Sequence, residues 1–139
     1  MNTESQPTPD QLRAKHAWKV VNFILKEYPP EMVGGKSVPH KSAKAFGGAA
    51  RKLPVRIMAS GLGQALAFLR AKNKSRDLLE ALGDWVLGER TQNALLDAVV
   101  NGTADSLREN TAAVLAYLQW LNRFCEANHL TDEVTSETE

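Results

Sequence analysis

The sequence has one cysteine, few aromatic residues and no long apolar run, and each of these shortages excludes a class of protein. A single cysteine, Cys125, among 139 residues excludes an internal disulfide framework and fits a reducing compartment. No apolar stretch reaches the roughly 18 residues that a membrane-spanning helix needs, so no membrane contact is expected. Residues 1–12 lack the basic-then-apolar order of a secretory signal. We therefore expect a cytoplasmic protein.

The sequence also lacks the residue clusters that carry catalysis or hold metals. Its three histidines, His16, His40 and His129, fall in three separate segments without metal-ligand spacing. Glu80 and Asp84 lie four apart on a predicted helix, where ordinary solvated side chains explain them better than acid–base catalysis. The stretch "GLGQAL" lacks the preceding strand and the third glycine of a dinucleotide-binding fingerprint. The sequence therefore predicts no enzyme, no metal site and no cofactor.

Acidic residues are scarce in the first half of the chain and basic residues in the second half, although the net charge is only +1. Residues 1–76 hold 14 Lys/Arg and 4 Asp/Glu, whereas residues 77–139 hold 3 Lys/Arg and 12 Asp/Glu. Such a division indicates a polyanionic partner for the basic half. The alternative is a solvated charge mosaic in which the two halves pair with each other. Composition alone leaves both interpretations open.

Apolar periodicity predicts helices along most of the chain and no convincing strand. We predict an all-α fold, a single-domain bundle of about five to six helices over residues 10–130. The flanking residues 1–9 and the acidic residues 131–139 are predicted to be disordered.

Proline, glycine and capping residues divide this bundle into segments. The first helix covers residues 10–28 with its core face on Ala17, Val20, Val21, Ile24 and Tyr28. Residues 29–40 form a Pro/Gly-rich loop, and a short basic helix over 41–53 ends before Pro54, which begins a further helix. Two short helices follow over 76–87 and 91–100. The last helix, 106–128, has a Ser106–Glu109 capping box and a core row that includes Cys125, and it is the predicted centre of packing.

The stretch "RIMASGLGQALAFLRAKNK", residues 56–74, keeps two glycines inside a helical pattern, each at roughly 0.5–1 kcal/mol against alanine. Plotted as one helix, residues 54–74 turn a core row inward, and Gly61 leans towards that row. The core row is Val55, Met58, Leu62, Ala65 and Leu69. The opposite side is small in the middle and cationic at both ends, which suits close approach by either a neighbouring helix or a nucleic-acid backbone. The candidate subunit-contact residues there are Ser60, Gly63 and Ala67.

Basic side chains gather on the same helix, on the segment before it and in a stripe on the first helix. The candidate residues for binding a nucleic acid, which the resemblance described below identifies as RNA, are Lys15, Lys19, Lys26, Lys41, Lys44, Arg51, Lys52, Arg56, Arg70, Lys72 and Lys74. Exposed aromatic residues are expected to be scarce, because Trp18, Trp85 and Trp120 fit core rows, so no base-stacking platform is predicted. The predicted mode is phosphate contact without sequence reading, which weakens steeply with salt.

Two blocks of the sequence resemble the small helical subunit of the type III-B CRISPR–Cas effector, the Cmr complex. The first block, "KLPVRIMASGLGQALAFLRAK", carries a Lys-Leu-Pro start, a Gly-Leu pair and an Ala-Phe pair before a lysine. These positions are Lys52, Leu53, Pro54, Gly61, Leu62, Ala67, Phe68 and Lys72. The second block, "ENTAAVLAYLQWLNRFCEA", carries the pattern of Trp120, Leu121, Arg123 and Phe124. The blocks cover about 40 residues.

The resemblance implies an all-helical, non-catalytic subunit for bacterial or archaeal antiviral defence. Members of that family stack head to tail in a minor filament beside the backbone subunits and help to hold the duplex of guide RNA and target RNA. The implied partners are therefore these RNAs, the backbone and large subunits, and further copies of the chain. Because head-to-tail stacking is heterologous, a basic half could meet an acidic half of the next copy.

A free-standing helical nucleic-acid-binding regulator is the alternative function. That reading requires a helix-turn-helix with polar base-reading side chains on its second helix, and we cannot place one in the sequence.

Overall fold

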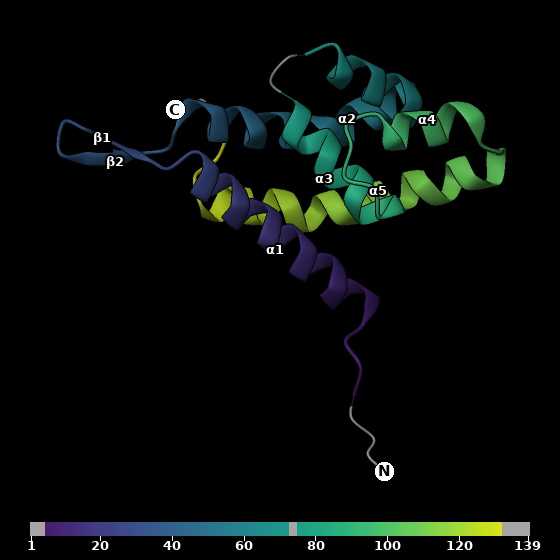
Figure 1. The fold of residues 1–139 in the computed structure, drawn as a ribbon, viewed down its shortest axis with the longest axis horizontal. Helices are drawn as coiled ribbons and strands as arrows, with labels where there is room; N and C mark the ends of the chain where they lie inside the picture. The colour runs from purple at the N-terminus through teal and green to yellow at the C-terminus, as the bar shows by residue number, and fades with distance from the viewer. Residues whose placement is uncertain (1–4, 73–74, 132–139) are drawn as a thin grey trace.

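The computed structural model describes residues 5–72 and 75–131, which form five helices and one small hairpin. The elements in chain order are α1 (Pro9–Glu27), β1 (Glu31–Val33), β2 (Lys36–Val38), α2 (Lys41–Arg70), α3 (Arg76–Leu87), α4 (Ala94–Asn101) and α5 (Ala104–Ala127). Figure 1 shows α2, α3 and α4 gathered along one side of α5, with α1 crossing α5 at an angle. The predicted all-α, single-domain bundle is confirmed.

Helix α5 is the centre of packing, as predicted, because it contacts each of the other four helices and makes the most extensive helix–helix contacts of the described residues, those with α1 and α2. Its buried residues are Val114, Tyr117, Leu118, Leu121 and Cys125. The predicted start is two residues late. Thr103 caps the helix, since its hydroxyl accepts from the backbone N–H of Ser106 while the Ser106 hydroxyl accepts from the backbone N–H of Thr103.

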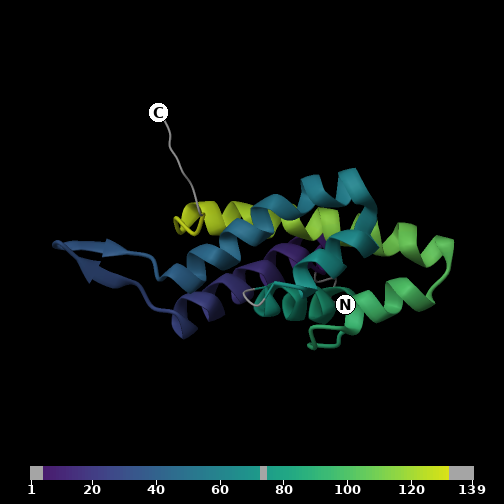
Figure 2. The same ribbon diagram turned by 90° about the horizontal axis from the view of Figure 1, so that it is seen from above.

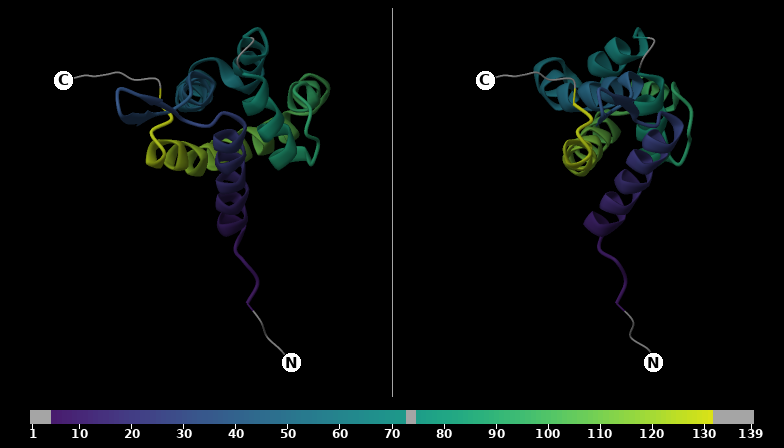
Figure 3. Two further views of the ribbon diagram at one scale, coloured as in Figure 1. Left: turned by 60° about the vertical axis from the view of Figure 1, so that its left-hand side comes forward. Right: turned by 90° about the vertical axis from the view of Figure 1, so that its left-hand side faces the viewer.

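Helix α1 buries the four aliphatic residues predicted for its core face, and Tyr28 follows as a half-buried cap. It begins at Pro9, where Thr8 and Gln11 form a reciprocal capping box with N···O distances of 2.8 and 3.0 Å. The views in Figure 3 confirm that α1 extends away from the rest of the bundle at its N-terminal end. The predicted disorder of the terminal segments stays a prediction, and residues 1–4 and 132–139 lie outside the described part.

The predicted helix break at Pro54 is wrong, because α2 runs through this proline without interruption. An interior proline leaves the carbonyl four residues earlier without its helical donor. Here that carbonyl belongs to Ala50, and the Asn122 side-chain amide of α5 donates to it at 3.0 Å. A side chain from the neighbouring helix therefore replaces the missing backbone hydrogen bond.

The real break in α2 is Gly61, which has φ 85° and ψ 162° in the middle of an otherwise helical run. Alanine and larger residues rarely adopt this conformation, so glycine is required by the backbone here. The kink changes the direction of the helix and also its rotational phase. A single helical plot consequently misplaced Val55 and Met58, which are 73% and 75% exposed rather than buried.

Residues 31–38 form an antiparallel hairpin instead of the predicted loop. Its two-residue turn is Gly34-Gly35, and both glycines have positive φ, as tight hairpin turns require. All six strand residues are exposed, so the strands lack the buried alternation from which a sequence reveals a strand. Figure 2 shows the hairpin projecting beyond the helices.

Helices α3 and α4 match the two short helices predicted, and Gly88 ends α3 in the left-handed conformation. Within the described residues, no helix combines the length and apolarity that crossing a membrane requires.

Candidate nucleic-acid interface

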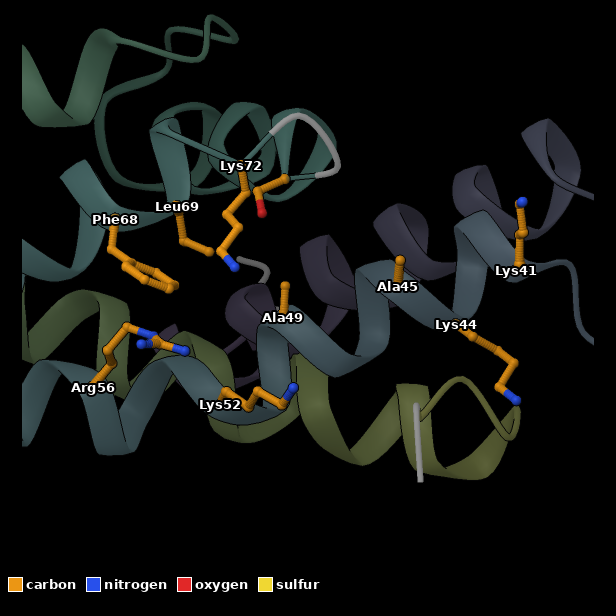
Figure 4. Close-up of a pocket in the computed structure, with 10 residues that line it drawn as sticks. Lys41, Lys44, Ala45, Ala49, Lys52, Arg56, Phe68, Leu69 and Lys72 are labelled. Carbon is orange, nitrogen blue, oxygen red and sulfur yellow. The ribbon is translucent and has the colours of Figure 1, made fainter. Parts of the chain in front are cut away.

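The kink at Gly61 folds the second half of α2 (residues 62–70) back towards its first half (residues 41–60), and a groove of about 450 Å³ lies between them. We call this hollow the α2 groove. Its lining residues are Lys41, Lys44, Ala45, Ala49, Lys52, Arg56, Phe68, Leu69, Lys72 and Ser75. Figure 4 shows the first half of α2 contributing most of the cations while Phe68, Leu69 and Lys72 come from above.

The contact between Arg56 and Phe68 shows that the two halves of α2 fold back on each other. These residues are twelve positions apart, which corresponds to about 18 Å along a straight helix. The Arg56 guanidinium nevertheless lies 3.8 Å from the centroid of the Phe68 ring, and the Lys72 ammonium lies 4.8 Å from it. Both are cation–π distances. The groove and this contact therefore depend on the non-helical backbone at Gly61.

The α2 groove is uniformly basic. Lys41, Lys44, Lys52 and Arg56 recur at helical spacing on one face of α2, and Lys72 faces them from beyond the kink. Among the described residues that line the groove, none is acidic. Ala45 and Ala49 have small side chains, so the backbone of a bound molecule can approach α2 closely between the cations. Clustered ammonium and guanidinium groups with a small floor suit phosphate oxygens.

Five of the eleven predicted RNA-binding residues meet in this groove, and five others lie elsewhere on the described part of the chain. Arg51 lines an adjoining hollow together with Lys52, Arg56 and Ser60. Arg70 points to α4 and donates from Nε to the Asn93 amide oxygen at 2.7 Å. Lys15, Lys19 and Lys26 are exposed on α1 and are not among the described lining residues. Lys74 lies outside the described residues.

The structure exchanges the roles predicted for the two glycines. Gly61, expected to serve internal packing, is exposed, and a Cβ there would have no neighbour within 4 Å. Gly63, expected on the outer surface, faces α4, where a Cβ would lie 3.3 Å from Cγ1 of Val99. Ser60 and Ala67 are exposed. Their contact with a neighbouring subunit stays a prediction.

Exposed aromatic side chains are less scarce than predicted. Phe68 is 39% exposed beside the cations of the groove. Trp18, predicted in a core row, is 47% exposed and packs edge-on against Phe124 with ring centroids 5.0 Å apart. The helical plot missed Phe68 because it treated residues 54–74 as one unbroken helix, whereas the phase changes at Gly61.

A polar network that the sequence did not reveal joins α1, α3 and α5. His16 Nδ1 lies 2.7 Å from the Tyr117 hydroxyl, and His16 Nε2 lies 2.8 Å from a carboxylate oxygen of Asp84. Asp84 is therefore not the freely solvated residue expected. The arrangement resembles a nucleophile, base and acid in series, but Tyr117 is completely buried. Burial also raises the pKa of Tyr117, so its hydroxyl stays protonated and out of reach of a substrate.

The remaining nucleophile and metal candidates give no reactive site. Burial raises the pKa of the Cys125 thiol to about 12, which keeps it protonated at neutral pH. In the described ranges 5–72 and 75–131, no three His, Cys, Asp or Glu side chains are close enough to hold a metal ion.

Comparisons with known proteins agree with the resemblance in the sequence. The family described as "CRISPR-associated protein (Cas_Cmr5)" matches residues 9–128. The CRISPR system Cmr subunit Cmr5 of Thermus thermophilus is 37% identical over 81 residues, which are 56% of this chain and 69% of that protein. The crystal structure of a CRISPR-associated Cmr5 family protein from the same organism matches with a TM-score of 0.70 and 29% identity. It covers 91% of this chain and 100% of that chain. The chain therefore belongs to the Cmr5 family of CRISPR-associated proteins.

Proposed function

We propose that the chain is a non-catalytic small subunit of a type III-B CRISPR effector complex and that the α2 groove holds guide RNA and target RNA by their phosphates. The observation that carries this proposal is the groove itself, where five cations converge and the described lining contains no acid. The Thermus thermophilus relative is named as a Cmr subunit, which supports membership of such a complex.

The partners that we propose are the backbone and large subunits of the complex and further copies of this chain stacked head to tail in the cytoplasm. The basic first half and acidic second half of the sequence support such heterologous association. Light scattering at low and high salt tests the self-association. A monomer at every salt concentration, even in concentrated solution, would contradict stacking through charge.

The binding mode that we propose is electrostatic and independent of sequence. Each lysine or arginine that meets a phosphate releases a condensed counterion, so the logarithm of affinity falls with the logarithm of salt by about 0.7 per single-strand phosphate. A groove with five cations should therefore give a steep salt dependence. It needs no base recognition, because the complex can take its sequence specificity from the guide RNA.

A matched pair of arginines on α2 tests the assignment to the groove. Arg56→Glu reverses a charge inside the groove, whereas Arg70→Glu reverses a charge that points to α4. Each variant is assembled into the complete complex, and retention of labelled target RNA is measured across a range of salt. We expect Arg56→Glu to weaken retention roughly tenfold and to flatten the salt slope, with little change for Arg70→Glu.

The outcomes separate the possible errors. Equal losses for both arginines, or no loss for either, would contradict the groove as the RNA-binding surface. Failure of the unmodified chain to enter the complex, together with DNA or RNA binding on its own, would favour the free-standing regulator.

A further inference from the structure

The Phe68 ring gives the α2 groove a feature that phosphate binding does not require. It is 39% exposed, and it carries the planar guanidinium of Arg56 at 3.8 Å from its centroid. A large apolar ring on a cationic rim loses hydrophobic stabilisation as long as water covers it. Unpaired bases stack on aromatic rings and on guanidinium planes. Here the Arg56 guanidinium and the Lys72 ammonium both lie over the ring, so the stacking surface is the guanidinium plane backed by Phe68.

The groove holds both halves of a nucleotide-binding arrangement within one hollow. Leu69, Ala45 and Ala49 supply further apolar lining of the groove, and the lysines supply the charges. A hollow of about 450 Å³ is of the size that usually accommodates a small-molecule ligand. Figure 4 shows the Phe68 ring and the Arg56 side chain facing the same open space as the Lys72 ammonium.

We propose that the α2 groove takes an unpaired nucleotide of an RNA strand, with its base stacked on the Arg56–Phe68 pair and a flanking phosphate on Lys72. Phosphates further along the same strand reach Lys44, which lies about 18 Å from Arg56 along the helix. The inference rests on the proposed function, since it specifies how the same groove meets RNA. A stacked nucleotide and phosphate contact alone predict different preferences between a single strand and a duplex. The bases of a duplex are already stacked on each other and are not available to a ring, so the groove prefers a single strand to a duplex.

Phe68→Leu is the variant that separates stacking from charge, because it keeps an apolar side chain of similar size and removes the aromatic face. Phe23→Leu is the matched control. Phe23 is 42% exposed on α1 and has the Arg90 guanidinium 5.3 Å from its ring centroid, so it is a comparable aromatic–cation pair outside the groove. Phe68→Trp restores a larger stacking surface and checks that the position tolerates substitution.

The measurement uses the full chain and two fluorescent RNA probes, a single strand of about 12 nucleotides and the same sequence as a blunt duplex. We expect the unmodified chain to bind the single strand more tightly. Phe68→Leu should weaken single-strand binding roughly tenfold and leave duplex binding unchanged, so that the preference disappears. Phe23→Leu and Phe68→Trp should keep it. Ultraviolet crosslinking of the single strand should place the crosslinked peptide at Phe68.

Lys44→Glu, measured with the same probes, distinguishes the two levels of the proposal. If Lys44→Glu weakens both probes and Phe68→Leu weakens neither, the groove binds RNA by phosphates alone and the stacked nucleotide is overturned while the proposed function stands. If neither variant matters, both proposals fail. A last measurement uses free uridine monophosphate as a competitor that displaces the single-stranded RNA probe. Displacement only at concentrations about 100-fold above those of the oligomer supports a strand, and displacement at equal concentrations overturns it in favour of a free nucleotide.

Discussion

The first half of α2 presents two faces that share a mix of small and large side chains but differ in polarity and in surroundings. Both mix alanines or glycines with larger side chains. The inner face buries Ala43, Phe46, Gly47, Ala50, Leu53 and Ile57. The outer face lines the groove with Lys41, Lys44, Ala45, Ala49, Lys52 and Arg56. Residue size alone therefore does not tell which face packs and which face binds.

The two faces differ in what the rest of the chain places against them. Opposite the inner face lie the backbone carbonyl of Leu130 at Gly47 and the amide of Asn122 at Ala50, so this face is completed within the fold. Opposite the outer face lie Phe68 and Lys72, which add an aromatic surface and more positive charge. We expect inner-face changes to alter stability and outer-face changes to alter RNA binding.

Gly47→Ala should have the largest effect on stability. A Cβ at this position would collide with the backbone carbonyl oxygen of Leu130, whose side chain is fully buried where the chain turns back after α5. A backbone obstacle cannot rotate away, so we expect a loss of about 3 kcal/mol or more in the free energy of unfolding, measured by urea denaturation. Ala45→Ser on the outer face adds one atom and should change it by less than about 0.5 kcal/mol. Similar losses for the two variants would erase the distinction between the faces.

Gly61→Ala should come next, and it should affect both faces. The φ of 85° at this position costs a residue with a Cβ about 2 kcal/mol. A chain that relieves this strain by straightening α2 would also separate Phe68 from Arg56. We therefore expect loss of stability together with weaker RNA binding. Gly63→Ala is the control, because its Cβ meets only the movable Val99 methyl and gains helix propensity, for a net change below about 1 kcal/mol. Stabilisation by Gly61→Ala would contradict the kink.

Gly61 marks the limit of what could be predicted about the helices from the sequence. Apolar periodicity was sufficient to predict α1, α3, α4 and the central α5, because each is one unbroken amphipathic helix. It failed in α2, where the plot assumed one helical phase across residues 54–74 while Gly61 resets the phase and direction. The positive φ at Gly61 is a backbone property, and a glycine inside a helical pattern is compatible with either packing or a kink.

The candidate site was predictable in its charges and not in its shape. Counting cations identified all five that line the groove. It did not separate them from Arg70 or from the α1 lysines, because that separation depends on the fold-back at Gly61. At Pro54 the error was the reverse, because a break was predicted where the helix continues. The hydrogen bond from Asn122 compensates for a residue that normally ends a helix.

Asn122→Ala should cost about 1–2 kcal/mol by leaving the carbonyl of Ala50 without a donor. The double variant with Pro54→Ala provides the control, because alanine at position 54 restores the backbone N–H that a helix normally donates to residue 50. We expect the cost of Asn122→Ala, from urea denaturation, to fall substantially in the Pro54→Ala background. An equal cost in both backgrounds would show that Asn122 stabilises the inner face by other contacts.

Lys44→Glu should have the smallest effect on stability, although it lies only three residues before Gly47 on the same helix. Its charge shares the groove with Lys41, Lys52 and Lys72, so reversal relieves repulsion among like charges while it removes part of the proposed phosphate site. We expect the free energy of unfolding to change by less than about 0.5 kcal/mol. Any change should be a stabilisation, and it should become smaller as the salt concentration rises. Urea denaturation at low and high ionic strength measures both. A loss above about 1 kcal/mol would mean that Lys44 is engaged within the fold, and the outer face would then be a packing surface like the inner one.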